Sequence, residues 1–566
     1  MLLNPKTATY DHLDERSREI MEKTIAFFEA QGKAKLKHDY HHRVWYDDFL
    51  NFQKENRIFA TLLTPSDYAD GDPDKRWDTA RICDFNEILG FYGLAYWYTW
   101  QVSILGLGPL WMSGNEEIKK KTARLLEDGA IFAFGLSEKA HGADLYSSDM
   151  TLTPLAEGRY VADGGKYYIG NANKAAIVST FGKNSETGEY VFFAADPTHE
   201  NYELVKNVVE WQSYVAEYAL SGYPVTEADI LSTGREAWDS ALNTINVGKY
   251  NLGWASIGIC THAFYEAVNH AAHRNLYGKF VTDFPHIRQI FVDAYTRLTA
   301  MKMFATRASD YMRSGCAEDR RYLLYNPIVK MKVTTQGEEV INLLWDVIAA
   351  RGFEKDVYFE NAASDIRALP KLEGTVHVNM ALIVKFMANY FFNPAEFPEI
   401  PRRIDAVNDD FLFRQGPTKG LGKIQFHDYA IAYGSVDLPN VTVFKEQIDG
   451  LKSMLMTAGP SVDQQKDMSY LLTLGEMFTL VAYGQLIIEK YRMENVSDDV
   501  LEQIFDVMVR DFTRYATALY LTPGLSDAQR ESCRGIVRAP AADPARFERI
   551  WKDHVYSRVD AYEMAP

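Results

Sequence analysis

The sequence predicts an α+β protein that is mainly helical, and three observations carry this prediction. The length of 566 residues exceeds what a single hydrophobic core supports. Apolar residues recur at spacings of three and four over most of the chain, which is typical of amphipathic helices. Between residues 131 and 235, short alternating or β-branched runs are separated by Gly, Asn and Asp, which predicts strands and turns. We therefore expect four domains, namely an N-terminal helical domain (1–130), a barrel-like antiparallel β domain (131–235), a four-helix bundle (236–395) and an extra C-terminal helical domain (396–566).

Helical spacing dominates the N-terminal region from Leu13 to about Glu127. In the next region, the expected strands are 151–153, 160–162, 167–169, 176–180 and 190–194. After Gly234 the helical spacing returns in four long segments, 243–274, 284–313, 326–350 and 373–392. Four long helices joined by short Gly- or Pro-containing breaks predict a bundle.

The C-terminal region is expected to add further helices. A proline-rich stretch from Phe392 to Pro401 predicts a linker, and residues 440–521 are again helical in pattern. A break is expected at 494–496, followed by an N-cap at Ser497. Apolar stripes on both sides of this break predict an antiparallel helix pair that packs on the main body.

Contact of this helix pair with a membrane surface is a competing interpretation that we do not favour. The polar faces carry Glu476, Glu489, Asp506 and Asp511 rather than an excess of Lys and Arg. No segment contains the roughly 20 continuous apolar residues needed to cross a bilayer. The N-terminus lacks a basic stretch followed by a long apolar run, so we expect no signal or transit peptide and a cytoplasmic location of bacterial type.

Charge and cysteine content exclude several classes of partner. A formal net charge of −17 gives the surface a negative field that repels phosphate backbones, so we expect no nucleic-acid partner. The four cysteines lie far apart without a CxxC pair, which predicts neither a zinc site nor a disulfide framework, and no metal is expected. These properties are typical of a soluble enzyme in a reducing compartment.

The first segment that could carry chemistry, 132–144, joins an apolar strand to a loop of small residues. The strand end can present hydroxyl and backbone N–H donors to a planar, oxygen-rich ligand, and the glycine permits close approach. An ordinary strand followed by a turn is the alternative. The candidate ligand contacts are Phe134, Leu136, Ser137, Gly142 and Ala143.

The second segment, 164–172, places tyrosines on a strand ahead of a Gly-Asn turn. An aromatic side chain such as Tyr168 could cover one face of a cofactor ring, with Ile169 and Gly170 beside it. A hairpin with two packed tyrosines explains the same pattern equally well.

The third segment, 273–285, follows a long helix. Arg274 offers a fork of donors suited to a pyrophosphate, and Tyr277 offers a ring against which an adenine could rest. The alternative is a helix C-terminus whose cation complements the helix dipole and which is capped by Gly278.

The fourth segment is a short turn from Leu372 to Thr375, directly after the pair Leu369 and Pro370. Its one acidic side chain, Glu373, means little alone. Its position behind the other three segments is what makes it a candidate for a single carboxylate base.

In this order, the four segments resemble the acyl-CoA dehydrogenase family of flavoproteins over roughly residues 20–395, and the layout with a C-terminal extension is similar to its very-long-chain members. The family motif Thr-Glu-Pro-x-Ala-Gly-Ser-Asp is matched by Ser137, Glu138, Gly142 and Asp144. Lys-x-Trp-Ile-Thr-Asn is matched by Lys166, Tyr168, Ile169 and Asn171, Arg-x-x-Phe-Gly by Arg274, Tyr277 and Gly278, and Glu-Gly-Thr by Glu373, Gly374 and Thr375.

The resemblance implies FAD as cofactor and Glu373 as the base that removes an α-proton from a thioester while a hydride leaves the β-carbon for flavin N5. A lone carboxylate in a site emptied of water would have its pKa raised toward the working pH. The resemblance further implies FAD contacts from the four segments, Thr375 included, and substrate contacts from Ser137, Gly248, Tyr250, Asn251 and Gly374. Some family members carry the base on an earlier helix, but here that place holds Gly248, which also leaves room for a longer acyl tail.

Departures from the family pattern fall on flavin contacts. Gly170 replaces a Thr, Ala143 a Ser and Pro285 a Gln. Asp346, Ala349, Ala350 and Arg351 stand where the family has a Gln-x-x-Gly-Gly-Tyr stretch that reaches a neighbouring subunit's cofactor. These changes put the FAD affinity in doubt.

The expected function is α,β-dehydrogenation of an acyl-CoA thioester, with a medium-to-long chain, to the trans-2-enoyl-CoA. The resemblance implies an electron-transfer flavoprotein as acceptor, and we expect a homodimer. An acyl-CoA oxidase that uses O2 and a non-catalytic thioester-binding scaffold on the same fold are the alternatives.

Overall fold

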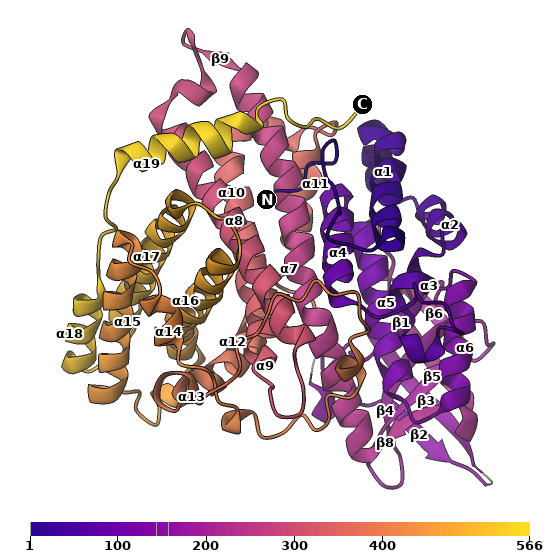
Figure 1. Cartoon of the computed structure of the whole chain (residues 1–566). Coiled ribbons are helices and arrows are strands. Elements are labelled where there is room, and N and C mark those ends of the chain that lie inside the picture. The colour runs from indigo at the N-terminus through magenta and orange to yellow at the C-terminus, as the bar shows by residue number, and fades with distance from the viewer. Residues whose placement is uncertain (1, 143, 157) are drawn as a thin grey trace. The chain divides into compact units, whose positions relative to one another are not determined.

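The computed structural model describes residues 2–142, 144–156 and 158–566, and it confirms the predicted fold class, which is mainly helical with an antiparallel-rich sheet (Figure 1). The chain forms two compact units. The sheet unit comprises Thr9–Asn251, Ile404–Lys419 and Met564–Pro566. The bundle unit comprises the residues up to Ala8, Leu252–Arg403 and Gly420–Glu563. The division falls inside helix α7 (Gly234–His273).

The helices of the sheet unit begin where the sequence provides caps. Asp14, Asp78 and Asn115 accept hydrogen bonds from backbone N–H groups in the first turns of α1, α4 and α6. Helix α5 carries almost only apolar residues and is buried along its whole length, where it packs on β1 and β4. The helices are α1 (Glu15–His42), α2 (Asp47–Glu55), α3 (Ile58–Leu63), α4 (Thr79–Tyr92), α5 (Leu94–Met112) and α6 (Glu116–Glu127).

The sheet has the order β6-β7-β3-β2-β4-β5-β8, with β1 paired to β4. Most pairings are antiparallel, as expected, but β1 and β2 each run parallel to β4. The long central pair of β3 with β7 is interrupted by two register shifts, one of which falls between Tyr167 and Ile169. The strands are β1 (Phe132–Gly135), β2 (Thr151–Pro154), β3 (Arg159–Gly170), β4 (Ile177–Asn184), β5 (Tyr190–Ala195), β6 (Tyr202–Asn207), β7 (Val215–Thr226) and β8 (Ile230–Thr233).

In the bundle unit, the four predicted long helices appear with different ends. Expected segment 326–350 is divided by a π-helical turn, and the helix expected from 373 begins only at Val376, because Thr375 is its N-cap. The elements are the end of α7, the hairpin strands β9 (Asn275–Leu276) and β10 (Lys279–Phe280), α8 (Pro285–Arg313), α9 (Tyr322–Ile328), η5 (Val329–Val333), α10 (Thr334–Ile348), α11 (Tyr358–Asp365), α12 (Val376–Ile383) and α13 (Met387–Phe392).

The predicted C-terminal helices are present, and Ser497 caps α17 as expected. Helices α16 and α17 pack on each other and on α8 (Figure 1). Among the described residues, α16 alone is long and apolar enough to cross a membrane, but 78% of its most apolar stretch is buried, as in a core helix. The helices are α14 (Tyr429–Gly434), α15 (Pro439–Thr457), α16 (Met468–Met493), α17 (Asp498–Tyr520), α18 (Asp527–Ile536) and α19 (Pro544–Arg549).

Buried ion pairs join these C-terminal helices to the bundle. Asp511 pairs with Arg297 at 2.6 Å, and Glu476 pairs with Lys332 at 2.9 Å. The Arg297 guanidinium donates to both carboxylate oxygens of Asp511, and although burial would raise the pKa of that carboxyl, the hydrogen bonds and charge of Arg297 lower it to about 2. Glu476 and Asp511, two of the acids that the sequence places on polar helix faces, therefore meet cations of the bundle rather than water.

The predicted linker after α13 is held on the bundle by arginines. Arg307 donates to the carbonyl of Ile400 at 2.7 Å, and the Arg321 guanidinium lies 4.3 Å from the centre of the Phe397 ring. The segment is therefore extended but anchored.

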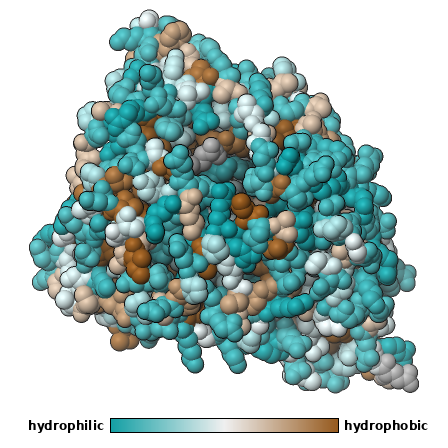
Figure 2. Space-filling view, in the orientation of Figure 1, coloured by the Kyte–Doolittle hydropathy of each residue, from teal (hydrophilic) through white to brown (hydrophobic). Residues whose placement is uncertain are grey.

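Figure 2 shows a face that is mainly hydrophilic, with hydrophobic residues in small groups, as the net charge of −17 leads one to expect.

Candidate active site

The predicted site residues fall into two groups, one in each unit. In the bundle unit, Glu373 lies in a loop between α11 and α12. The loop is attached to α10 on one side, because Arg367 donates to Asn342 Oδ1 at 2.6 Å and Lys371 forms an ion pair with Glu338. Glu373 is half-buried, and the two residues after it lead directly into α12.

The backbone of Glu373 is strained. Its φ is +52°, in the left-handed region, and Gly374 follows with φ +92°. For a residue with a Cβ, this conformation costs roughly 1–2 kcal/mol. Gly374 is required for the second left-handed position, and Glu373 tolerates the first only because the surrounding structure imposes it.

Strained residues gather at the sequence-predicted segments. Nine non-glycine residues in the described part of the chain have positive φ, and five of them lie in the four motif segments or in the stretch that departs from the family pattern. These five are Tyr168, Asn171, Tyr277, Ala349 and Glu373. Strain of this kind clusters at functional sites, so the backbone marks the second, third and fourth segments as candidates for function.

Gly374 and Thr375 organise the start of α12. The Thr375 hydroxyl accepts a hydrogen bond from the N–H of Val378, and the Gly374 carbonyl accepts one from Asn379 Nδ2 at 3.1 Å. Thr375 is exposed and Gly374 is half-buried. Their contacts within the protein are thus those of a rigid turn that presents Glu373.

Tyr277 lies on a two-stranded hairpin that the sequence did not predict, and Arg274 directly precedes the first strand of this hairpin. Tyr277 and Gly278 form its two-residue turn with φ of +54° and +78°, the combination typical of type I′ turns. Gly278 is therefore a hairpin residue rather than the cap of α7. The Tyr277 side chain is 96% exposed, so its ring is available to a ligand.

A second arginine joins Arg274 at the end of α7. Arg351 Nη1 lies 3.0 Å from His270 Nδ1, and Arg274 Nη1 lies 3.4 Å from His270 Nε2. Burial and then the charges of Arg351 and Arg274 lower the pKa of His270 to about 4, so this imidazole is neutral at pH 7. Arg274 and Arg351 therefore supply the positive charge of this cluster, and the His270 imidazole adds none at pH 7.

In the sheet unit, the predicted contacts meet at the end of β1. Phe134 is buried and stacks on Phe192, and the loop that follows turns toward β3. Ser137 Oγ donates to the carbonyl of Tyr167 at 2.8 Å, and the N–H of Tyr167 donates to the Ser137 carbonyl at 3.0 Å. The first and second predicted segments are thus joined directly. Ala143 lies outside the described residues.

The Glu138 carboxylate fixes this loop through hydrogen bonds to residues 148–150. It accepts hydrogen bonds from the Ser148 hydroxyl and from two backbone N–H groups, those of Asp149 and Met150, and Lys166 Nζ lies 2.7 Å from Oε1. Burial would raise the pKa of Glu138, but the charge of Lys166 and these hydrogen bonds lower it to about 2.

Lys166 links the same loop to β3. Its Nζ also donates to the Leu136 carbonyl at 3.1 Å, and burial lowers its pKa to about 8, against the opposing effect of Glu138. The contribution of Leu136 to this loop is therefore the hydrogen bond that its backbone carbonyl accepts from Lys166.

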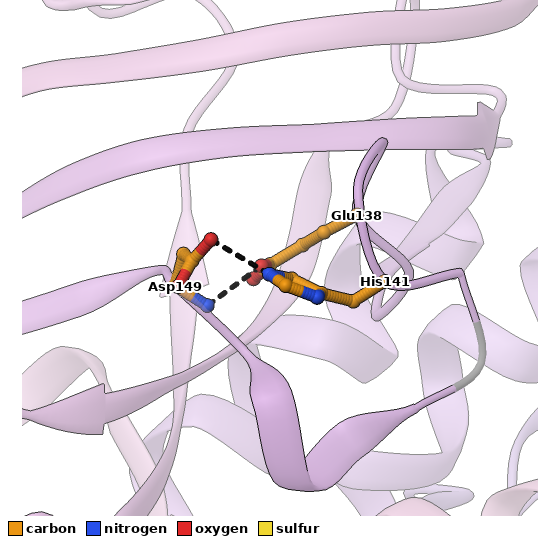
Figure 3. Close-up of side chains that lie close together, drawn as sticks. All are labelled: Glu138, His141 and Asp149. Atoms are coloured by element: carbon orange, nitrogen blue, oxygen red, sulfur yellow. Dashed lines mark hydrogen bonds and ion pairs between the residues drawn. The ribbon is translucent and has the colours of Figure 1, made fainter.

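Glu138, His141 and Asp149 also bring three metal-type ligand atoms within 4.8 Å of one another (Figure 3). His141 Nε2 and Asp149 Oδ2 are 2.7 Å apart, and the Asp149 N–H bonds Glu138. The Lys166 ammonium already neutralises the Glu138 carboxylate, so a second cation would be repelled. We assign no metal to this cluster.

Tyr168 lies at the β-bulge in β3. The register shift between Tyr167 and Ile169 gives Tyr168 its φ of +67° and turns its ring outward, where it is 45% exposed, while Ile169 points into the core. Both tyrosines of the predicted strand are present, but only the bulge explains why Tyr168 is available for stacking.

Gly170 and Asn171 end β3 against α5. A Cβ at position 170 would lie 2.6 Å from Cε1 of Tyr98, so no side chain fits there. Asn171 Nδ2 is within hydrogen-bond distance of the carbonyls of Thr99 and Phe132. The departure from Thr at position 170 is therefore a consequence of the Tyr98 ring.

The predicted substrate contacts on α7 are buried in the sheet unit. Asn251 accepts from Asn86 Nδ2 at 2.9 Å and donates to Gln101 Oε1 at 2.8 Å, and Gln101 in turn donates to the Gly248 carbonyl at 3.2 Å. Tyr250 is 1% exposed. Asn251 thus has a structural role that joins α7 to α4 and α5.

Sequence reasoning missed three polar residues that the structure brings to these segments. Arg351 and His270 meet Arg274, and a buried lysine on η5, Lys330, meets the Glu373 loop. The sequence did contain a signal for Lys330, because it lies between Val329 and Met331 in an apolar part of a helix and a buried lysine needs a partner.

Comparisons with known proteins agree with the sequence resemblance. A family model described as "Acyl-CoA dehydrogenase, C-terminal domain" matches residues 236–388. A 3-(aryl)acrylate reductase of Clostridium sporogenes is 23% identical over 333 residues, which cover 57% of this chain and 86% of the relative. A caffeyl-CoA reductase-Etf complex subunit of Acetobacterium woodii is 24% identical over 309 residues, covering 53% and 80%.

The fold of the whole chain has a solved counterpart. The structure of an acyl-CoA dehydrogenase from Bacillus anthracis, complexed with FAD, has a TM-score of 0.75 and 17% identity and covers 99% of this chain and 98% of its own. The C-terminal helices are therefore part of a fold that is already known from a solved structure.

Proposed function

We propose that the chain is an oxidoreductase of the acyl-CoA dehydrogenase type and that it catalyses the FAD-dependent α,β-dehydrogenation of an acyl-CoA thioester with Glu373 as the base. The observation that carries the proposal is the strained, anchored loop that holds Glu373. A solvated turn carboxylate would gain nothing from a left-handed backbone. Glu373 therefore has the fixed position that proton abstraction requires.

Each unit, taken by itself, has residues that fit a part of a flavin dinucleotide. Arg274 and Arg351 supply two guanidinium groups for a pyrophosphate, and Tyr277 supplies an exposed ring for an adenine. In the sheet unit, the exposed Tyr168 ring and the loop at Ser137 are suited to a planar ring system. Bound FAD would supply the acceptor for the hydride that leaves the β-carbon.

The protein's own part of the reaction is proton transfer. The α-proton of a thioester is weakly acidic, so the base must be held close to it and water must be excluded. The acyl chain would displace water from the Glu373 carboxylate, which leaves the carboxylate as the proton acceptor beside the α-carbon. The backbone N–H of Glu373, in its fixed left-handed position, is a candidate donor to the thioester oxygen.

Two relatives are named as reductases, so the direction of the reaction is part of the proposal. The same carboxyl can return a proton to the α-carbon of an enoyl thioester, because both directions share one transition state. We favour the dehydrogenase direction. The acyl chain is proposed to be medium to long because Gly248 removes a side chain from α7. An electron-transfer flavoprotein is the proposed partner, supported by the relative whose name includes an Etf complex.

Three measurements on the purified protein test this proposal. A visible spectrum with flavin bands supports a flavoprotein, whereas a colourless protein that takes up no FAD on reconstitution points to the thioester-binding scaffold. A panel of saturated and 2-enoyl thioesters of different chain lengths, assayed with an artificial electron acceptor or a reductant, defines direction and chain length. Stoichiometric peroxide during turnover in air would show an acyl-CoA oxidase instead.

A further inference from the structure

Two lysines of the π-helical turn η5 are buried, and they contact different parts of the bundle unit. Lys330 is 0% exposed and Lys332 is 1% exposed. Residues two apart on a helix point to opposite sides. Lys330 accordingly faces the loop that carries Glu373, and Lys332 faces the C-terminal helices, where it binds Glu476 and the Tyr515 hydroxyl.

Local sequence accounts for the wide turn. Pro327 lies inside α9 and lacks the N–H that would continue the regular hydrogen-bond ladder. The Thr334 hydroxyl donates to the Lys330 carbonyl at 2.5 Å, which provides that carbonyl with a partner from the side chain. Turns of this type occur frequently at functional sites.

The Lys330 ammonium bonds the loop on both sides of Glu373. Its Nζ lies 2.6 Å from the Pro370 carbonyl and 2.5 Å from the Gly374 carbonyl. Pro370 precedes Glu373 by three residues and Gly374 follows it directly. One rigid cation therefore closes the loop whose backbone has positive φ at Glu373 and Gly374.

We propose that Lys330 is a positioning residue, which fixes the strained loop and thereby the direction of the Glu373 carboxylate. This inference rests on the proposed role of Glu373. Hydrogen bonds from a charged donor are the strong ones, and two of them on one loop leave little freedom at the residue between them. Without them, the loop can relax from its left-handed conformation, and the carboxylate moves away from the reacting carbon.

The test compares Lys330→Met with Lys332→Met in the full-length holoenzyme. Both substitutions remove a buried ammonium from the same turn, so they share the general cost of the change. For Lys330→Met we expect kcat to fall about 10- to 100-fold with KM within about threefold of the wild type, because misplacement of about 1 Å has effects of this size. Lys330→Arg, which keeps the charge and the donors, should recover part of kcat.

Hydrogen–deuterium exchange of residues 366–378 provides a readout that needs no turnover. Lys330→Met should exchange at least about threefold faster there than the wild type, whereas Lys332→Met should change exchange in α16 and leave this loop and kcat near wild type. Should Lys330→Met not fold, Lys330→Gln carries the same comparison. Wild-type kcat and loop exchange in the Lys330 variant, or equal effects in both variants, would overturn the proposal.

Failure of the proposed function gives a different pattern. In that case Glu373→Gln would retain activity while the loop still exchanges faster in Lys330→Met. Failure of the positioning role gives an inactive Glu373→Gln together with an unaffected Lys330→Met.

Discussion

The ring of Tyr98 on α5 occupies the space beside Gly170 at the end of β3, so that a Cβ at position 170 would lie 2.6 Å from its Cε1. This relationship explains why the chain departs from the threonine of the family motif. Val102 is a second close neighbour, at 2.9 Å. The absence of a threonine hydroxyl at position 170 is thus linked to the packing of α5, whose residues are distant in sequence.

Gly170→Thr should therefore destabilise the protein by about 1–3 kcal/mol, the usual cost of overpacking. The double variant Tyr98→Ala with Gly170→Thr should lose less stability than the sum of the two single variants, because the smaller side chain makes room. Urea denaturation of the four proteins measures this coupling. Strictly additive free energies of unfolding would contradict the packing explanation.

Ala349→Gly should stabilise the protein or leave its stability unchanged. Ala349 has φ +54° and ψ −136°, a conformation available almost only to glycine, so the substitution relieves strain of roughly 1–3 kcal/mol against an entropic cost of about 0.5–1 kcal/mol. Ala350→Gly is the matched control. Ala350 does not have a positive φ, so this variant should be slightly less stable than the wild type. Thermal unfolding that ranks the two variants in the reverse order would refute this account.

The Glu138 network makes part of the stability depend on pH. Because the pKa of Glu138 is lowered in the folded protein from 4.5 to about 2, its carboxylate stabilises the fold above pH 4.5, and this contribution is lost as the pH falls toward 2. Glu138→Gln should cost about 3 kcal/mol at pH 7, at 1.36 kcal/mol per pKa unit, and less at pH 3.5.

Urea unfolding of both proteins at several pH values measures that difference. Asp149→Asn serves as the control, since this side chain is 77% exposed and the bond from Asp149 to Glu138 comes from its backbone N–H. A difference between wild type and Glu138→Gln that is constant from pH 7 to 3.5 would argue against the buried ion pair.

Arg351 should contribute to FAD binding as Arg274 does. Either substitution by alanine removes one of two positive charges that flank the neutral His270, so we expect the Kd for FAD to rise about tenfold in each case, consistent with about 1.4 kcal/mol per charge-assisted bond. Fluorescence titration of the apoprotein measures Kd directly. Arg534→Ala, at an exposed position on α18, should leave Kd unchanged. An Arg351→Ala protein with wild-type affinity would remove Arg351 from the site.

The sequence predicted the helical and strand regions well because their apolar periodicity is strong. The mainly antiparallel sheet was correct for this reason, and the N-cap at Ser497 was correct because serine is a preferred capping residue. The hairpin at Tyr277 was not predicted, since its strands have only two residues each and carry no alternation. The start of α12 was placed too early, because Glu373 and Gly374 have left-handed backbones that propensity does not reveal.

The motif residues of the candidate site could be found from sequence because each lies in a short segment with a recognisable pattern. The supporting residues could not, because their partners are distant in the chain. Lys330 meets a carbonyl 44 residues away, and Arg351 meets a histidine 81 residues away. A lysine or arginine at an otherwise apolar position of a helix is the sequence signal for a polar partner that is distant in the chain.

The central claim is that Glu373 is the proton acceptor, and turnover of Glu373→Gln on the best thioester of the panel tests it most directly. The amide keeps the size and position of the side chain but cannot accept the proton. We predict wild-type flavin content and thioester binding with kcat lowered at least about 10³-fold. A variant that binds both and turns over within tenfold of wild type would contradict the assignment.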